Sequence, residues 1–143
     1  AVIQTMTPEN NIIRLAKKQD YLEFYKDEIE IRRYMIYPPF CDICSVCAVS
    51  DDELKALSAA KLFLEEFRKA VDKEKKTVKV IALPVMPPRI AKVNNKFRYR
   101  IIIKCKNNAE FRHIISNLLI EFGASKTFGD VTMVADINPS SLV

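Results

Sequence analysis

Glycine is scarce in this sequence, and tryptophan is absent. Two glycines, Gly123 and Gly129, stand among 143 residues. Their scarcity excludes a collagen-like or linker chain, and a hydrophobic content of 49% excludes disorder. A phosphate-cradling loop needs two spaced glycines followed by lysine and serine or threonine, and the chain contains no such string. We therefore expect a folded domain without a nucleotide-hydrolysing loop of its own.

Long apolar runs are also missing. No run approaches the roughly 18 residues that a membrane span requires, and no signal-type stretch follows Ala1. Four cysteines without a secretory context are typical of reduced thiols in the cytoplasm. These absences predict a soluble cytoplasmic domain that does not act at a membrane.

Acidic residues are missing from one stretch of the chain. Positions 75 to 109 hold ten of the 23 basic residues and none of the 18 acidic ones. The formal net charge of +5 is thus the sum of a cationic segment and an otherwise acidic body. Such a run is often only a solvated face, but the complete lack of carboxylates favours an anionic partner.

Hydrophobic periodicity and turn residues predict the order of the elements. We expect helices from about 8 and 20, a strand over 41–49, a helix after 53, strands over 77–83, 89–93 and 96–105, a helix over 111–122 and a strand over 131–135. From position 41 this order is typical of an α+β fold, a ferredoxin-like βαββαβ sandwich with two helices on one face of a mostly antiparallel sheet. A helical segment precedes it.

Local signals refine these predictions. Thr7 can cap the first helix with Pro8 in its first position, and Ser50 begins a capping box that ends at Glu53. Asn94 and Asn95 can take the positive backbone angles of a tight hairpin. One apolar stripe is expected on the helix after 53, comprising Leu54, Leu57, Leu64, Phe67 and Val71.

The spacing of Cys41, Cys44 and Cys47 resembles that of an iron–sulfur motif. The fourth cysteine and proline of the bacterial ferredoxin run are absent, and alternation along a strand turns Cys44 away from the other two. We expect small apolar residues in a buried strand, with no metal and no cofactor. His113 is expected at the surface, and no catalytic residue is predicted.

The cationic strand over 96–105 is the candidate binding element. Alternation places Phe97 and Tyr99 on one face and Arg98, Arg100 and Lys104 on the other. The cationic face can grip a nucleic-acid backbone without reading sequence, whereas exposed aromatics would indicate an RNA-recognition module. The candidate contacts are Arg89, Lys92, Lys96, Arg98, Arg100 and Lys104.

Several of these residues carry a resemblance to a known family. The N-terminal signature comprises Gln4-Thr5, Pro8-Glu9, Asp20-Tyr21, Phe24-Tyr25, Glu28 with Arg32, and Tyr37-Pro38-Pro39-Phe40. The C-terminal signature comprises Phe97-Arg98-Tyr99 with Lys104, and Asp136-Ile137-Asn138-Pro139 with Ser141-Leu142. Together they resemble the end of primosomal protein N′, a bacterial replication-restart helicase. The chain departs from that family at Leu83-Pro84 and at Asn94-Asn95.

The resemblance implies a carboxy-terminal fragment of an ATP-dependent helicase that moves 3′ to 5′ and recognises branched DNA. Residues 1–40 would be the helicase-lobe tail and a helical linker, and 41–143 a ferredoxin-like DNA-binding domain. ATP, magnesium and zinc would belong to the rest of the parent. Implied partners are forked or single-stranded DNA, the helicase lobes, single-stranded DNA-binding protein and other primosome proteins.

Two protein contacts follow from this resemblance. Arg112 would meet the acidic tail of single-stranded DNA-binding protein. The apolar face formed by Tyr21, Phe24, Tyr25 and Ile31 would pack against the helicase lobes, or else form ordinary core within this domain.

Overall fold

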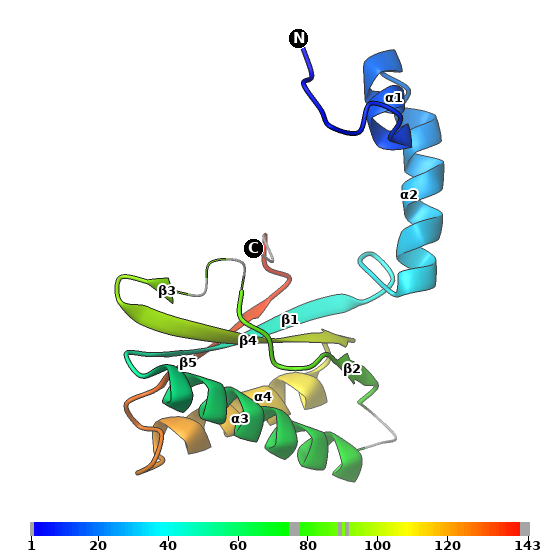
Figure 1. The fold of residues 1–143 in the computed structure, drawn as a ribbon. Coiled ribbons are helices and arrows are strands. Elements are labelled where there is room, and N and C mark those ends of the chain that lie inside the picture. The colour runs from blue at the N-terminus through cyan, green and yellow to red at the C-terminus, as the bar shows by residue number, and fades with distance from the viewer. Residues whose placement is uncertain (1, 75–77, 89, 91, 141–143) are drawn as a thin grey trace. The chain divides into compact units, whose positions relative to one another are not determined.

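The chain folds into two compact units, Ala1–Phe40 and Cys41–Val143. The computed structural model describes residues 2–74, 78–88, 90 and 92–140 (Figure 1). In chain order the elements are α1 (Asn11–Lys18), α2 (Tyr21–Met35), β1 (Asp42–Ser50), α3 (Glu53–Lys73), β2 (Val80–Ala82), β3 (Lys92–Val93), β4 (Lys96–Cys105), α4 (Ala109–Gly123) and β5 (Thr132–Ile137). Within the described ranges no helix is both long enough and apolar enough to cross a bilayer.

The first unit is a pair of helices, and the side chain of the residue before each helix caps its N-terminus. Asn10 Oδ1 accepts from the Ile12 N–H at 2.9 Å, so α1 begins at Asn11 and the predicted start at Thr7 and Pro8 is wrong. The Thr7 carbonyl instead closes a turn with the Asn10 N–H. The second helix begins as predicted, because Asp20 Oδ1 accepts from the Glu23 N–H at 3.2 Å.

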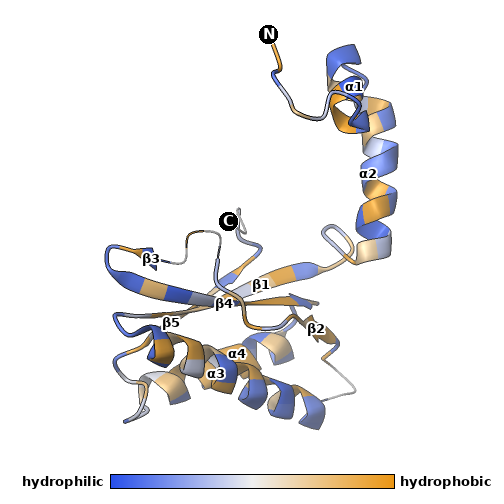
Figure 2. Ribbon diagram, in the orientation of Figure 1, coloured by the Kyte–Doolittle hydropathy of each residue, from blue (hydrophilic) through white to orange (hydrophobic). Residues whose placement is uncertain are grey.

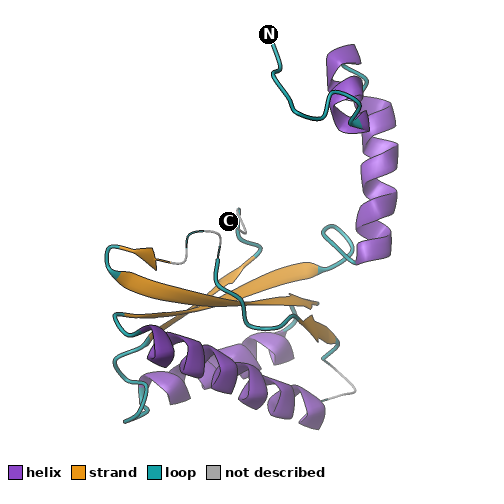
Figure 3. Cartoon of the chain, viewed as in Figure 1, coloured by secondary structure: helices purple, strands orange, loops and turns teal. Residues whose placement is uncertain are grey.

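The second unit is a sheet covered on one face by two helices. The strand order is β2-β4-β1-β5 with antiparallel neighbours throughout, and β3 pairs with β4 as a hairpin. Both α3 and α4 lie on the same side of this sheet (Figure 3). This is the ferredoxin-like arrangement, so the predicted fold class is confirmed.

The core lies between the sheet and its helices. In the central pair of strands Cys44 stands opposite Ile103, and Val46 stands opposite Ile101. All four side chains are fully buried. Residues at even positions of β1 and odd positions of β4 therefore face the helices, and their neighbours face the other side.

The helix α3 is capped by a later residue than the sequence predicts, and its predicted apolar stripe is confirmed in part: Leu64 and Phe67 are buried and Val71 packs against the core. Asp52, not Ser50, is its N-cap, because its carboxylate accepts from the N–H groups of Leu54 and Lys55. Leu54 is 73% exposed, so its predicted place in the core is wrong. Its buried face combines small alanines with larger apolar side chains. The buried residues are Ala56, Ala59, Ala60, Phe63, Leu64 and Phe67.

Candidate nucleic-acid interface

A tight hairpin joins β3 to β4 and carries two of the predicted contacts. Asn94 and Asn95 both have positive φ angles, 50° and 60°. A two-residue hairpin turn of this kind needs a positive φ at both central positions. Glycine adopts such angles most easily, and asparagine adopts them more easily than most other residues. Lys92 pairs with Phe97 across the turn, and Val93 pairs with Lys96. The predicted hairpin is therefore observed.

Both hairpin lysines are exposed. The Lys92 ammonium lies 4.6 Å from the centre of the Phe97 ring. The Lys96 ammonium lies 4.0 Å from Asp51 Oδ1, with both side chains largely in solvent. Exposed pairs of this kind contribute about 1 kcal/mol or less, so either lysine can exchange its neighbour for a phosphate.

Two arginines of β4 are held more closely. Arg98 and Arg100 lie on the sheet face without helices and are half-buried. Arg98 Nη2 donates to the Ile90 carbonyl at 2.5 Å, and the Arg100 backbone pairs with Met86 in both directions. Among the described atoms the Nε of each arginine is buried without a hydrogen-bond partner. The Arg98 side chain and the Arg100 backbone thus both bond to the segment that precedes the hairpin.

The remaining predicted phosphate contacts differ in their exposure to solvent. Lys104 lies on the helix-free face, opposite Ile43 on one side and Ile81 on the other, and is 9% exposed. Lys96 shares this face with Lys104, whereas Lys92 shares the face of Phe97. Arg89 lies outside the described residues. The structure therefore brings the β4 cations onto one face but gives them unequal access to solvent.

Sequence reasoning missed the acidic neighbours of this face. The 75–109 segment has no carboxylate, yet Asp51 reaches Lys96 from the β1–α3 loop. Asp136 stands on β5 opposite Ser45, on the same helix-free face. No local signal in the sequence could have shown these carboxylates, because the register of β5 places Asp136 and the path of the β1–α3 loop places Asp51.

The two aromatics of β4 face the helices. Phe97 pairs with Ser50, and Tyr99 pairs with the buried Ala48. The Tyr99 hydroxyl donates to Glu53 Oε1 of α3 at 2.9 Å, which raises the pKa of the phenol. An RNA-recognition module presents its stacking aromatics on the open sheet face. Phe97 and Tyr99 do not lie on that face here.

Arg112 on α4 is exposed but already bonded. Its Nη1 donates to the Asn107 carbonyl at 3.2 Å and to Asn107 Oδ1 at 3.0 Å. These contacts tie the loop before α4 to its first turn. The neighbouring His113 is also exposed, as predicted, and its Nε2 lies 3.1 Å from Asn117 Nδ2.

The cysteines alternate across the sheet as their spacing predicts. Cys44 and Cys105 are buried on the helix-covered face, and burial raises the pKa of each thiol to about 12. Burial also raises the pKa of Cys47, which lies on the opposite face beside Arg98 and Arg100. Within the described part of the chain no group of three histidine, cysteine or carboxylate side chains could hold a metal ion.

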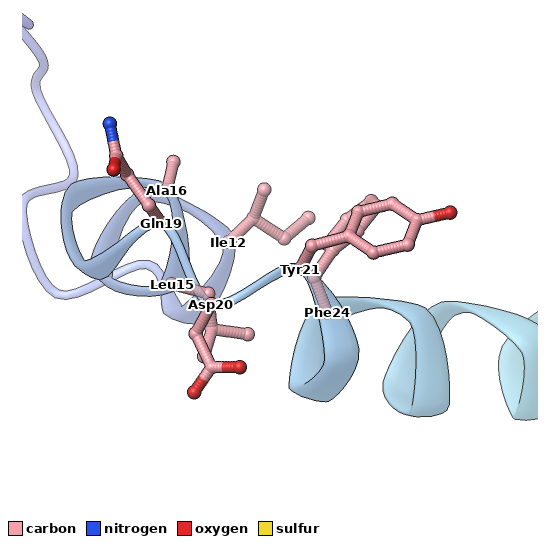
Figure 4. A pocket seen from close by; sticks show the side chains of 7 residues that line it. All are labelled: Ile12, Leu15, Ala16, Gln19, Asp20, Tyr21 and Phe24. Carbon is pink, nitrogen blue, oxygen red and sulfur yellow. The ribbon is translucent and has the colours of Figure 1, made fainter.

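The helical unit has an apolar pocket instead of a core. The pocket has a volume of about 410 Å³ and opens between α1 and the start of α2 (Figure 4). Apolar side chains make up nearly all of its wall. Its lining residues are Ile12, Leu15, Ala16, Gln19, Asp20, Tyr21 and Phe24.

Apolar residues of α2 also remain exposed, interleaved with hydrophilic ones along the helix (Figure 2). Tyr21, Tyr25 and Ile31 are each more than half exposed, and Phe24 is half-buried. The alternative that these residues form ordinary core is therefore not observed within their own unit.

The end of α2 and the loop that follows it contain residues of the N-terminal signature. Arg32 Nε donates to Glu28 Oε1 at 2.8 Å, and Arg32 Nη1 donates to the Pro38 carbonyl at 3.1 Å. The Arg33 guanidinium lies 5.3 Å from the centre of the Phe40 ring. Residues that carry the resemblance are thus in mutual contact at the end of α2.

Comparisons with known proteins agree with the resemblance. No family model matches the chain. The chain is 27% identical over 138 residues to replication restart protein PriA of Bacillus subtilis, covering 96% of this chain and 16% of that protein. It is 26% identical over 142 residues to PriA of Borreliella burgdorferi, covering 99% of this chain and 20% of that protein. It is 31% identical over 101 residues to PriA of Rickettsia felis, covering 71% of this chain and 14% of that protein.

PriA is another name for primosomal protein N′, so the predicted resemblance is confirmed. The chain spans about one-sixth of the length of the Bacillus relative. Among solved structures, a designed protein with a ferredoxin fold aligns with a TM-score of 0.46 and 19% identity, over 71% of this chain and 90% of that chain.

Proposed function

We propose that this chain is the non-catalytic C-terminal part of a PriA-type replication-restart helicase and that it binds branched or single-stranded DNA through its basic hairpin. Its similarity to only 16% and 20% of the lengths of two PriA relatives supports a fragment of a larger protein. The parent would supply the ATP-driven 3′ to 5′ helicase activity in the cytoplasm, and this part would hold the DNA.

The observation that carries the proposal is the hairpin with its two exposed lysines. Lys92 and Lys96 stand on either side of a two-residue turn, each with only a weak neighbour. A lysine ammonium is a point charge that suits a phosphate and does not read base edges. Binding through these groups would therefore depend strongly on salt and little on sequence.

The other proposed phosphate contacts lie on the sheet and are less exposed than the hairpin lysines. Arg98 and Arg100 are half-buried and Lys104 is buried, so we rank them behind the hairpin lysines as phosphate contacts. Arg98 also holds the Ile90 carbonyl, which supports a second role in positioning the segment before β3. Arg89 completes the proposed set.

The proposed docking on the helicase lobes rests on the first unit. Only Leu15 is buried among its described residues, while Tyr34 of α2 is 87% exposed. Exposed apolar surface of this extent, next to an apolar pocket, is typical of a segment that packs on a larger body. The helicase lobes of the parent chain are the proposed body.

Fluorescence anisotropy on forked and single-stranded DNA tests the DNA-binding proposal. The variant is Lys92→Ala/Lys96→Ala in the 143-residue chain, titrated over a series of salt concentrations. Each lost phosphate contact lowers the slope of log affinity against log salt by about 0.7 on single strands and about 0.9 on duplex. We expect the double variant to bind more weakly and to lose about twice those values.

The matched control is Lys61→Ala/Lys73→Ala on α3, which removes the same charge from exposed positions away from the hairpin. A shared loss of affinity in both double variants would indicate a general charge effect. Unchanged affinity and slope in the hairpin variant would refute the assignment.

Two alternatives receive less support. An RNA-recognition module is disfavoured because Phe97 and Tyr99 face the helices. Docking of single-stranded DNA-binding protein at Arg112 stays a prediction. The Arg112 guanidinium would have to bind the partner while it also donates hydrogen bonds to Asn107. A titration with an acidic tail peptide, followed by NMR, would show shifts around Arg112 if that prediction holds.

A further inference from the structure

Three large apolar side chains are exposed around the basic hairpin. Met86 is 38% exposed, Ile90 is 60% exposed and Val93 is 40% exposed. All three lie within the stretch from 75 to 109 that has no carboxylate. Apolar residues scattered singly over a surface are ordinary, whereas grouped ones indicate an interaction site. Their arrangement therefore decides whether they form a surface.

Two of these side chains are placed by backbone pairing with β4. Met86 exchanges backbone hydrogen bonds with Arg100, and Val93 pairs with Lys96 beside the turn. Residues directly opposite each other in an antiparallel pair point to the same face of the sheet. Met86 and Val93 therefore lie on the helix-free face, each next to a cation of β4.

Ile90 lies between these two pairs in the chain. Its carbonyl accepts a hydrogen bond from Arg98 Nη2, which holds the backbone while the side chain stays exposed. The cations of β4 in these three contacts are the alternate residues 96, 98 and 100, spaced by about 6–7 Å along the strand. The three apolar residues thus follow a row of cations.

An unpaired nucleic-acid strand matches both properties of this surface. Its phosphates are anionic, and its bases expose apolar faces that a duplex hides within its stack. Apolar side chains enter a duplex only by unstacking a base step, which costs free energy. Apolar residues beside a row of cations therefore stabilise binding to a single strand more than binding to a duplex.

We infer, on the basis of the DNA binding proposed above, that this hairpin selects unpaired strands through apolar contacts with their bases. Lys96 holds a phosphate, while Val93 and Ile90 contact the neighbouring bases. Met86 extends the apolar surface along β4. Aliphatic side chains do not read the hydrogen-bonding edges of bases, so the preference is for the unpaired state and not for a sequence.

The double variant Ile90→Thr/Val93→Thr tests these contacts, because it keeps the charge and the β-branched shape of both side chains. Fluorescence anisotropy compares its binding to oligothymidine, to a strand of equal length with abasic sites, and to duplex DNA. Burial of a single methylene contributes about fourfold in affinity, so we expect at least about fivefold weaker binding to oligothymidine. Binding to the abasic strand and to duplex should be unchanged, as should the salt dependence.

The matched control is Ile120→Thr/Val134→Thr, which makes the same two changes at exposed positions outside the hairpin. We expect it to bind each DNA as the parent chain does. Equal weakening in both double variants would overturn the inference. Circular dichroism measures the folding of each variant, and Ile90→Thr alone, at a residue outside the strand pairing, repeats the test if the double variant unfolds.

Failure of the apolar contacts is distinguishable from failure of DNA binding. Equal loss on intact and abasic strands, or on strand and duplex, would overturn the inference because the unpaired bases would then play no part. Loss of binding to anionic phospholipid vesicles instead of oligothymidine would also overturn it.

Comparison with Lys92→Ala/Lys96→Ala separates the two proposals. If that variant weakens binding and Ile90→Thr/Val93→Thr does not, the apolar contacts are refuted and DNA binding by the hairpin stands. If neither variant weakens binding, both proposals are refuted.

Discussion

Asn138 joins three segments of the ferredoxin-like unit. Its φ of 53° turns the chain at the end of β5, and its Oδ1 accepts from the Ile43 N–H at 3.0 Å. Its Nδ2 donates to Asp42 Oδ1 at 2.9 Å, while the other Asp42 oxygen accepts from the Asn107 N–H. The Asn138 amide, followed by the Asn107 N–H, lowers the pKa of Asp42. One asparagine thus fixes the ends of β1 and β5.

We predict that Asn138→Ala lowers the free energy of unfolding by about 1–3 kcal/mol at neutral pH, because it leaves a carboxylate and an N–H without their partner. Asp42 has a depressed folded pKa, so its contribution is present above its unfolded pKa and is lost as the pH falls through the folded value. The difference between the variant and the parent chain should therefore shrink in acid.

Urea unfolding from neutral pH to about pH 3, below the ordinary aspartate pKa of about 3.9, measures both effects. Asn117→Ala on the exposed face of α4 is the control, and its effect should stay within about 0.5 kcal/mol. An equal loss of stability at every pH would contradict the role assigned to Asp42.

At the scale of elements, α3 is packed by its smallest residues. Ala59 is fully buried, whereas the larger Leu54 is largely exposed in the first turn. Phe63 and Phe67 fill the remaining space, where Phe63 contacts Phe122 and Phe67 contacts Phe111 of α4. The buried face of α3 therefore holds alanines beside phenylalanines that contact α4.

We predict that Ala59→Leu lowers the free energy of unfolding by about 1–3 kcal/mol, because Ala59 is fully buried in the core and the added atoms would overpack it. Leu54→Ala should change it by about 0.5 kcal/mol or less. Urea unfolding of both variants makes the comparison. A larger loss of unfolding free energy in Leu54→Ala than in Ala59→Leu would indicate that Leu54 packs in the core, as the sequence predicts.

At the scale of the whole molecule, the two units differ in what stabilises them. The sheet and its helices enclose the main hydrophobic cluster, all of it within Cys41–Val143. The helical unit buries one hydrophobic side chain among its described residues, Leu15. Units of about 40 residues rarely fold alone without disulfides, metals or a partner.

We predict that a chain of residues 41–143 unfolds cooperatively with a midpoint close to that of the whole chain. An isolated peptide of residues 1–40 should be mostly unstructured, because it cannot bury enough apolar surface to offset its conformational entropy. Circular dichroism during urea titration separates the two outcomes. A stable helical peptide would argue against the proposal that this unit packs on the helicase lobes.

The sequence by itself determined the elements, the ferredoxin-like order and the Asn94–Asn95 hairpin. These depend on signals between residues close in the chain: alternation along β4, the period of α4 and the backbone preference of asparagine. The same locality explains the errors at Thr7 and Ser50, where several nearby side chains can cap a helix and packing selects one.

Only the tertiary structure decided which cations are accessible. Arg98, Lys96 and Lys104 are equally charged in the sequence, yet the fold ties the first to Ile90, sets the second beside Asp51 and buries the third. It also left Val134 exposed on an edge strand. Access and charge pairing depend on strand register and on residues distant in the chain, and no local pattern encodes either.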